Sequence, residues 1–136
     1  MKRTIALLVL AAALSPFIGF GAESQTWVCR KCGDKVRKAA RPNVSYCAAG
    51  GNHDWNSLGA TGSGIYVCRK CRMKVEAAAR PNVSYCQTGG NHDWNLLGQK
   101  GRNPYVCRKC RLKVRTQERP NVSYCAAGGN HDWKAY

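Results

Sequence analysis

Residues 29–55 read CRKCGDKVRKAARPNVSYCAAGGNHDW, and the same pattern returns at 68–94 and at 107–133. The offset is 39 residues both times, and 19 of the 27 positions are identical in all three copies. A fixed period of this length is typical of a repeat array, in which each repeat is one small structural unit. The sequence therefore predicts three tandem modules, at residues 26–58, 65–97 and 104–136.

Each copy contains three cysteines and one histidine in the spacing C-x2-C-x14-C-x5-H. Four such side chains are the ligand set of a closed tetrahedral zinc site. A module of roughly 30 residues is too small to be held by a hydrophobic core alone, so it needs a staple. We therefore expect three zinc ions per chain as cofactors. The predicted ligands are Cys29, Cys32, Cys47 and His53 in the first copy, Cys68, Cys71, Cys86 and His92 in the second, and Cys107, Cys110, Cys125 and His131 in the third.

Disulfides are the alternative use of these cysteines, as one bond within each C-x-x-C pair and one free thiol per module. Three cysteines per module is an odd number, so they cannot all pair within a module. Disulfides also give no reason for a histidine at a fixed distance from the third cysteine. Both arguments favour zinc.

The repeated pattern resembles the zinc ribbons, a family of small rubredoxin-like β modules. The resemblance covers residues 27–58, 66–97 and 105–133, and it implies two ligand-bearing turns, or knuckles, on a small antiparallel sheet. In that family a glycine commonly follows the first C-x-x-C, as Gly33 does here, whereas Arg72 and Arg111 stand at this position in the other copies. If the left-handed turn is kept, each arginine costs roughly 1–2 kcal/mol relative to glycine. The expected fold class is small, metal-stabilised β, with three tandem zinc-ribbon-like antiparallel modules after a signal peptide.

Short alternating runs predict the strands of each module. In the first copy, Trp27-Val28 is expected to be a strand that ends at the first knuckle. Lys35-Val36-Arg37 is expected to be a second strand, with its valine inward and its charges outward. The chain should then turn around Arg41-Pro42 and return as a third strand, Asn43–Tyr46, whose Val and Tyr share a face.

Large rings lie beside the predicted ligands in every copy. Each module has an aromatic residue before the first knuckle, a tyrosine before the third cysteine and a tryptophan two residues after the histidine. We expect these rings to form the core of each module, since it has little else to bury; a stacking platform for bases or sugars is the alternative. The aspartate after each histidine is expected either to orient the imidazole or to cap a turn. These aspartates are Asp54, Asp93 and Asp132.

The connections between modules are rich in glycine. Leu58 and Leu97 are expected to finish a further strand in their modules. The segments after them, Gly59–Gly64 and Gly98–Pro104, predict flexible linkers that let neighbouring modules reorient.

Residues 1–21 have the pattern of a secretory signal peptide, with Lys2 and Arg3 before an apolar run at 5–14 and small residues at a cleavage site. A membrane anchor is the alternative, but the apolar run is shorter than the ~20 residues that a span needs. The predicted location is therefore secreted or periplasmic, with no stable membrane span after cleavage.

The chain is strongly basic, with 22 Lys and Arg against 7 Asp and Glu and a formal net charge of +15. Most basic residues lie in 29–41, 68–80 and 107–119, which predicts three basic hairpins facing an anionic envelope polymer, a nucleic acid or an acidic protein. An ordinary solvated surface is the alternative. The residues expected to make these contacts are Arg30, Lys31, Lys35, Arg37, Arg69, Lys70, Arg72, Lys74, Arg108, Lys109, Arg111 and Lys113.

The sequence argues against an enzyme. No pair of carboxylates recurs that could share acid and base roles, and a site with four protein ligands leaves no position for a water. No small-molecule substrate is evident. We expect a secreted, non-enzymatic binding protein. A protein–protein interaction scaffold and a zinc-buffering protein are the alternatives.

Overall fold

The computed structural model describes residues 22–136, so the predicted signal peptide lies outside the described residues. In this part of the chain the protein is all β, and no helix there is long and apolar enough to cross a membrane. The strands are β1 (Gln25–Cys29), β2 (Lys35–Lys38), β3 (Trp55–Ala60), β4 (Gly64–Cys68), β5 (Lys74–Ala77), β6 (Trp94–Cys107), β7 (Lys113–Thr116) and β8 (Trp133–Ala135).

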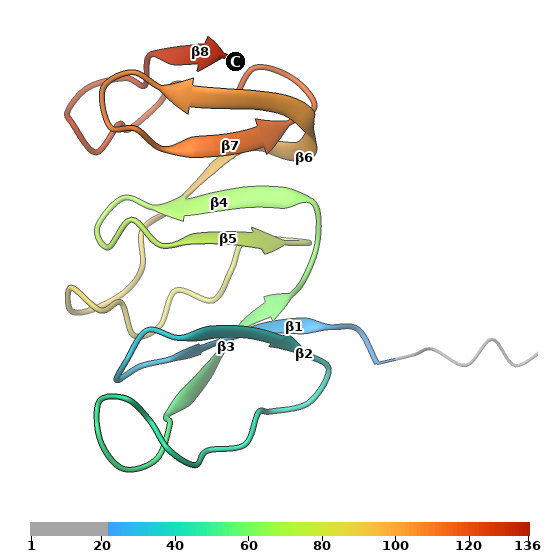
Figure 1. The fold of residues 1–136 in the computed structure, drawn as a ribbon, viewed down its shortest axis with the longest axis vertical. Helices are drawn as coiled ribbons and strands as arrows, with labels where there is room; N and C mark the ends of the chain where they lie inside the picture. Colours follow the sequence, from blue (N-terminus) through green and yellow to red (C-terminus); the bar gives the residue numbers. More distant parts are fainter. Residues whose placement is uncertain (1–21) are drawn as a thin grey trace, which may run out of the picture.

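The strands form three small antiparallel layers that are stacked along the long axis of the molecule (Figure 1). In the first layer β1 lies between β2 and β3, with Trp27 opposite Val36 and Cys29 opposite Trp55. The second layer, β5-β4-β6, and the third, β7-β6-β8, repeat this pairing. The long strand β6 belongs to both of them. The repeat in the sequence is therefore a repeat in space, and the second and third layers share the strand β6.

The valine-centred strands predicted after the first knuckle are present as β2, β5 and β7. Leu58 lies in β3 and Leu97 in β6, so the further strand is confirmed as well. The strand predicted at Asn43–Tyr46 is wrong, because these residues form no ladder. The carbonyl of Asn43 instead accepts a hydrogen bond from Trp55 Nε1 at 2.8 Å, and the carbonyl of Val44 accepts one from the His53 amide.

The prediction of flexible linkers is also wrong. Gln25 pairs with Ala60 and Gly64 with Gln99, so both connections extend the sheets. The Ala78 amide donates to the Ala60 carbonyl at 3.0 Å, and the Gln117 amide donates to the Gln99 carbonyl at 3.0 Å. Each connection is thus tied to the module that follows it.

Two linker glycines allow a close approach between backbones. A Cβ at Gly62 would lie 2.3 Å from the backbone of Ala78, and a Cβ at Gly101 would lie 2.3 Å from the amide nitrogen of Gln117. No side chain fits at either distance. Glycine is needed at these positions for close packing and not for flexibility.

The later cores are built from two modules each. Val28 and Leu58 of the first module are buried with Val75 and Trp94 of the second. Ile65 and Leu97 are buried in the same way with Val114 and Trp133. The first module has a smaller cluster of its own, made of Cys29, Cys47 and Trp55.

Candidate metal centres

The first knuckle brings two cysteines together on a left-handed turn. β1 ends at Cys29, and the amide of Gly33 donates back to the Cys29 carbonyl at 2.9 Å. Gly33 has a φ of 78°, and the arginines at the same position keep this turn, with φ of 62° at Arg72 and 63° at Arg111. The ligand geometry is therefore the same in all three copies, although two of them hold a residue that is strained there.

The second knuckle is a wider turn between the third cysteine and the histidine. The Gly50 amide donates to the Cys47 carbonyl at 2.9 Å, and the Cys47 amide donates to the Gly51 carbonyl at 2.8 Å. Both glycines have positive φ, 95° and 65°. This Gly-Gly pair lets five residues between Cys47 and His53 reverse the chain and return the imidazole to the sulfurs.

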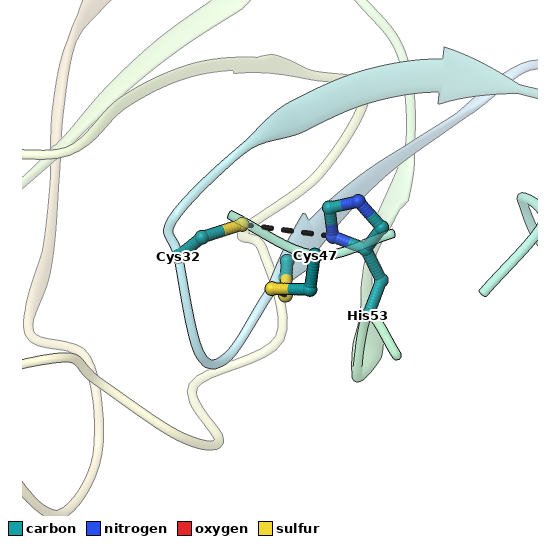
Figure 2. A group of neighbouring side chains, drawn as sticks. Cys32, Cys47 and His53 are labelled. Atoms are coloured by element: carbon teal, nitrogen blue, oxygen red, sulfur yellow. Dashed lines mark hydrogen bonds between the residues drawn. The ribbon is translucent and has the colours of Figure 1, made fainter. Parts of the chain in front are cut away.

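The four predicted ligands of the first module converge on one point. Cys29 Sγ and Cys47 Sγ lie 3.8 Å apart, and Cys32 Sγ lies 3.6 Å from His53 Nδ1. Figure 2 shows the Cys32 and Cys47 sulfurs and the imidazole nitrogen turned toward one another. With zinc–sulfur bonds of about 2.3 Å, the edges of a ZnS3N tetrahedron are about 3.5–3.8 Å. These two distances match such edges, and all four ligand atoms lie within 4.8 Å of one another.

The other two modules repeat this arrangement. Cys68 Sγ and Cys86 Sγ lie 4.0 Å apart, and Cys107 Sγ and Cys125 Sγ lie 3.8 Å apart. The histidine Nδ1 is 3.5 Å from the second cysteine of the motif in both cases. Within each group, the ligand atoms all lie within 4.8 Å of one another, and all nine cysteines are free thiols. The described residues therefore hold three Cys3His groups that could each bind a metal ion.

Neighbouring groups fix the orientation of the ligands. The indole of Trp55 stacks on the imidazole of His53, with ring centroids 4.6 Å apart, and the other two pairs of His and Trp do the same. The Asp54 amide lies 3.4 Å from Cys29 Sγ and donates to it. The tryptophans are buried, as predicted, with 5–8% of their surface exposed. Each imidazole is therefore held with Nδ1 toward the sulfurs.

The thiols of one group have very different pKa values. Burial raises the pKa of Cys29, but backbone hydrogen bonds from Cys32 and Asp54 outweigh burial and lower this pKa to about 6. Burial and hydrogen bonds with the neighbouring sulfurs raise the pKa of Cys32 to about 12. One thiolate forms readily, and further thiolates need a cation beside them. Such a cluster couples metal binding to proton release.

Among residues 22–136, the carboxylates of the aspartates after the histidines bond to arginines and to neither an imidazole nor a turn amide, so neither role predicted for them is found. Asp54 forms an ion pair with Arg30, and Arg30 Nε donates to the Asp54 carboxylate at 2.6 Å. Asp93 pairs with Arg69 in the same way. This pairing places each arginine against the next module, where the Arg30 guanidinium lies 3.9 Å from the ring centroid of Tyr85.

The tyrosines before the third cysteine are not core residues, so that prediction is wrong. Tyr46, Tyr85 and Tyr124 are 93%, 56% and 58% exposed. Each has a positive φ, 58–63°, which no sequence pattern indicated. Arg69 covers Tyr124 at 3.8 Å, as Arg30 covers Tyr85, so two of the rings form contacts between modules.

Many of the basic residues expected to contact a partner are used inside the fold. Lys35 Nζ donates to the Lys74 carbonyl of the next module at 2.8 Å, and Lys70 Nζ donates to the Gly89 carbonyl at 2.7 Å. The residues with such internal contacts are Arg30, Lys35, Arg37, Arg69, Lys70, Lys74, Arg108 and Lys109. Among residues 22–136, Lys31, Arg72, Arg111 and Lys113 make no side-chain hydrogen bond or ion pair of this kind, and the Lys113 ammonium lies 5.9 Å from the Tyr136 ring centroid.

In its described residues the chain is a small all-β protein with three Cys3His groups that could each hold a metal ion. Comparisons with known protein families, with curated proteins and with solved structures found no match.

Proposed function

We propose that the protein is a secreted or periplasmic, non-enzymatic binding protein in which three structural zinc ions hold a stack of zinc-ribbon-like modules. The observation that supports zinc best is the tetrahedral spacing of three thiols and one imidazole in every module. Burial lowers the pKa of His92, which favours the neutral imidazole that binds a metal. Four protein ligands complete a tetrahedral zinc site, which supports a structural role.

The proposed partner is an anionic polymer or an acidic protein surface. Arg72 and Arg111 are exposed, carry no internal partner among the described residues and occupy the same position in successive modules. The turns that carry them lie along one edge of the stack, on the left in Figure 1. Lys31 lies in the equivalent turn of the first module. Cations repeated on a stack of fixed spacing suit a long polyanion, since several weak contacts form together.

An interaction scaffold is the second candidate, favoured by Tyr46, whose side chain is 93% exposed. Zinc buffering has less support. Cys29, Cys68 and Cys107 are completely buried, which disfavours rapid metal exchange.

The test is a titration of the zinc-loaded protein with a heparin-like polymer, duplex DNA and anionic vesicles at two salt concentrations. The variant combines Arg72→Gly with Arg111→Gly, because Gly33 shows that the turn accepts glycine. It should bind the preferred polyanion more weakly while keeping its fold, and the salt slope should decrease. The matched control is Lys70→Ala, which removes a cation that is used inside its own module. An affinity that does not depend on salt concentration, or that is the same in the double variant, would contradict the proposed partner.

A further inference from the structure

We propose that the protein associates head to tail with further copies of itself through the two end faces of its stack. The inference goes beyond the anionic partner and does not depend on it. Its basis is an interface that the chain already forms twice within itself, between the first and second modules and between the second and third.

The two internal interfaces share the same contacts. An arginine of one module covers a tyrosine of the next, as Arg30 covers Tyr85 and Arg69 covers Tyr124. A lysine ammonium donates to the carbonyl of the equivalent lysine one module on, from Lys35 to Lys74 at 2.8 Å and from Lys74 to Lys113 at 3.0 Å. The interface is therefore directional, with the arginine side and the tyrosine side on opposite faces of every module.

The backbone completes this interface. The Asn82 amide donates to the Leu58 carbonyl at 3.0 Å, and the Asn82 side chain donates to the Ser57 carbonyl at 3.2 Å. Asn121 makes the same pair of bonds to the second module, at 2.7 and 3.2 Å. The asparagine at the equivalent position of the first module is Asn43. Among residues 22–136, neither the amide nor the side-chain nitrogen of Asn43 donates such a bond.

In the part of the chain that the structure describes, no module covers the tyrosine side of the first module. We define the head face as Asn43, Tyr46, Ala48 and the backbone of Lys35. Tyr46 is 93% exposed, against 56% and 58% for its counterparts, because no arginine among the described residues lies over it. The head face therefore offers the same asparagine donors, the same lysine carbonyl acceptor and the same ring that the second and third modules use.

Within residues 22–136, no other module covers the arginine side of the third module. We define the tail face as Val106, Arg108, Arg111 and Lys113, the counterparts of Val67, Arg69, Arg72 and Lys74. The side chain of Arg108 is 61% exposed, against 35% for Arg69, and its ion pair with Asp132 is loose at 3.9 Å. A tyrosine ring is the contact that Arg108 lacks in comparison with Arg30 and Arg69.

The sizes of facing residues also match. Gly33 lies against Gln87, so that a Cβ on Gly33 would meet the Gln87 amide group at 2.2 Å. At the interface between the second and third modules the large residue belongs to the earlier module, since Arg72 and the small Ala126 line one pocket together. A tail-to-head contact would bring Arg111 against Ala48, the same pairing of a large and a small residue. In this contact Asp34 of one copy would occupy the position that the apolar Leu112 has at the second internal interface. Its negative charge would meet the positive charges of Arg111 and Lys113 of the other copy.

Charge works against this contact at long range. Every copy carries a formal net charge of +15. At the first internal interface Arg37 meets Glu76, but between copies Arg115 of one copy would face Arg37 of the next. Salt screens such repulsion. Self-association should therefore strengthen as salt rises, whereas binding to a polyanion should weaken. The two proposals are thus distinguishable in one set of conditions.

The contact joins two different faces, so it is heterologous, and repeating it makes open chains of copies. The test is sedimentation velocity of the zinc-loaded protein over a range of concentrations in moderate salt. The average mass should keep rising with concentration without a limit at the dimer. Tyr46→Ala and Arg108→Ala should each weaken association by roughly fivefold or more, the order expected for a lost cation–π contact.

Mixing the two variants gives the sharpest result. The Tyr46→Ala chain keeps an intact tail face and the Arg108→Ala chain an intact head face, so the mixture should form one-to-one heterodimers through one unchanged contact, roughly fivefold or more tighter than either variant associates with itself. Tyr85→Ala is the matched control, because it changes the same residue type at an internal interface and should leave self-association unchanged. Amide spectra check that each variant is folded. A monomer at every concentration and salt, or variants that fail to complement each other, would overturn the proposal.

Discussion

Arg72 and Arg111 hold a backbone conformation that favours glycine, and Gly33 occupies the same position in the first module. Replacing either arginine by glycine should relieve this strain and raise the free energy of unfolding by about 1 kcal/mol. Chemical denaturation of the zinc-loaded variants measures the change. The reciprocal change, Gly33→Arg, should destabilise the protein, since an L-residue is strained at the φ of 78° that Gly33 holds. Loss of stability in Arg72→Gly would contradict this reading of the turn.

The role of single residues was predictable where metal coordination fixes their spacing in the sequence. The three Cys3His groups follow from the motif, because three thiols and an imidazole repeated at constant distances serve a metal whatever the surrounding sheet. The exposure of Tyr46, Tyr85 and Tyr124 was not predictable. It depends on a left-handed backbone at each tyrosine, and for Tyr85 and Tyr124 also on an arginine 55 residues earlier in the chain.

At the scale of elements, the connections between modules are part of the sheet. β6 runs from Trp94 to Cys107, with a register shift against β7 between Lys100 and Asn103, and Gly101 lies against the end of β7. Gly101→Ala should therefore cost about 1–3 kcal/mol by overpacking against backbone. Thermal or chemical unfolding gives the value. Arg102→Ala is the control, as an exposed neighbour that should change stability by less than about 0.5 kcal/mol. A tolerated alanine at Gly101 would show that the connection is not held in this position.

The strands beside the first knuckle were predictable because Val36, Val75 and Val114 each lie between charged residues in a short alternating run. The connections were not, because glycine has two uses that composition cannot separate. It serves as a flexible residue in linkers and as the only residue that fits where backbones meet. At Gly62 and Gly101 the second use applies. The strand predicted at Asn43–Tyr46 failed because those carbonyls accept bonds from Trp55 and His53.

At the scale of the whole molecule, the modules are expected to depend on their neighbours. Leu58 is 2% exposed and belongs to the core of the second module. Leu58→Ala should cost roughly 2–5 kcal/mol. The loss should appear in the amide signals of the second module more than in those of the third, as in a linear array with nearest-neighbour coupling. Equal loss in all three modules would show one cooperative unit, and loss confined to the first module would contradict the shared core.

Stacking also makes the three sites unequal. His92 and His131 are 4% and 7% exposed, whereas His53 is only partly buried because no described module precedes it. A chelator should therefore remove metal from the first site before the other two. Amide spectra recorded during chelation show the order, through signals near Trp55, Trp94 and Trp133. Metal that leaves the third site first would contradict this order.

The central claim is that three Cys3His groups are zinc sites and that zinc holds the stack together. Metal analysis of the purified protein, with reactive thiols counted before and after chelation under denaturing conditions, tests it most directly. We expect three zinc ions per chain, with the nine cysteine thiols unreactive before chelation and all reactive after it. Protein without metal, in which each C-x-x-C pair is oxidised and one thiol per module is free, would contradict it.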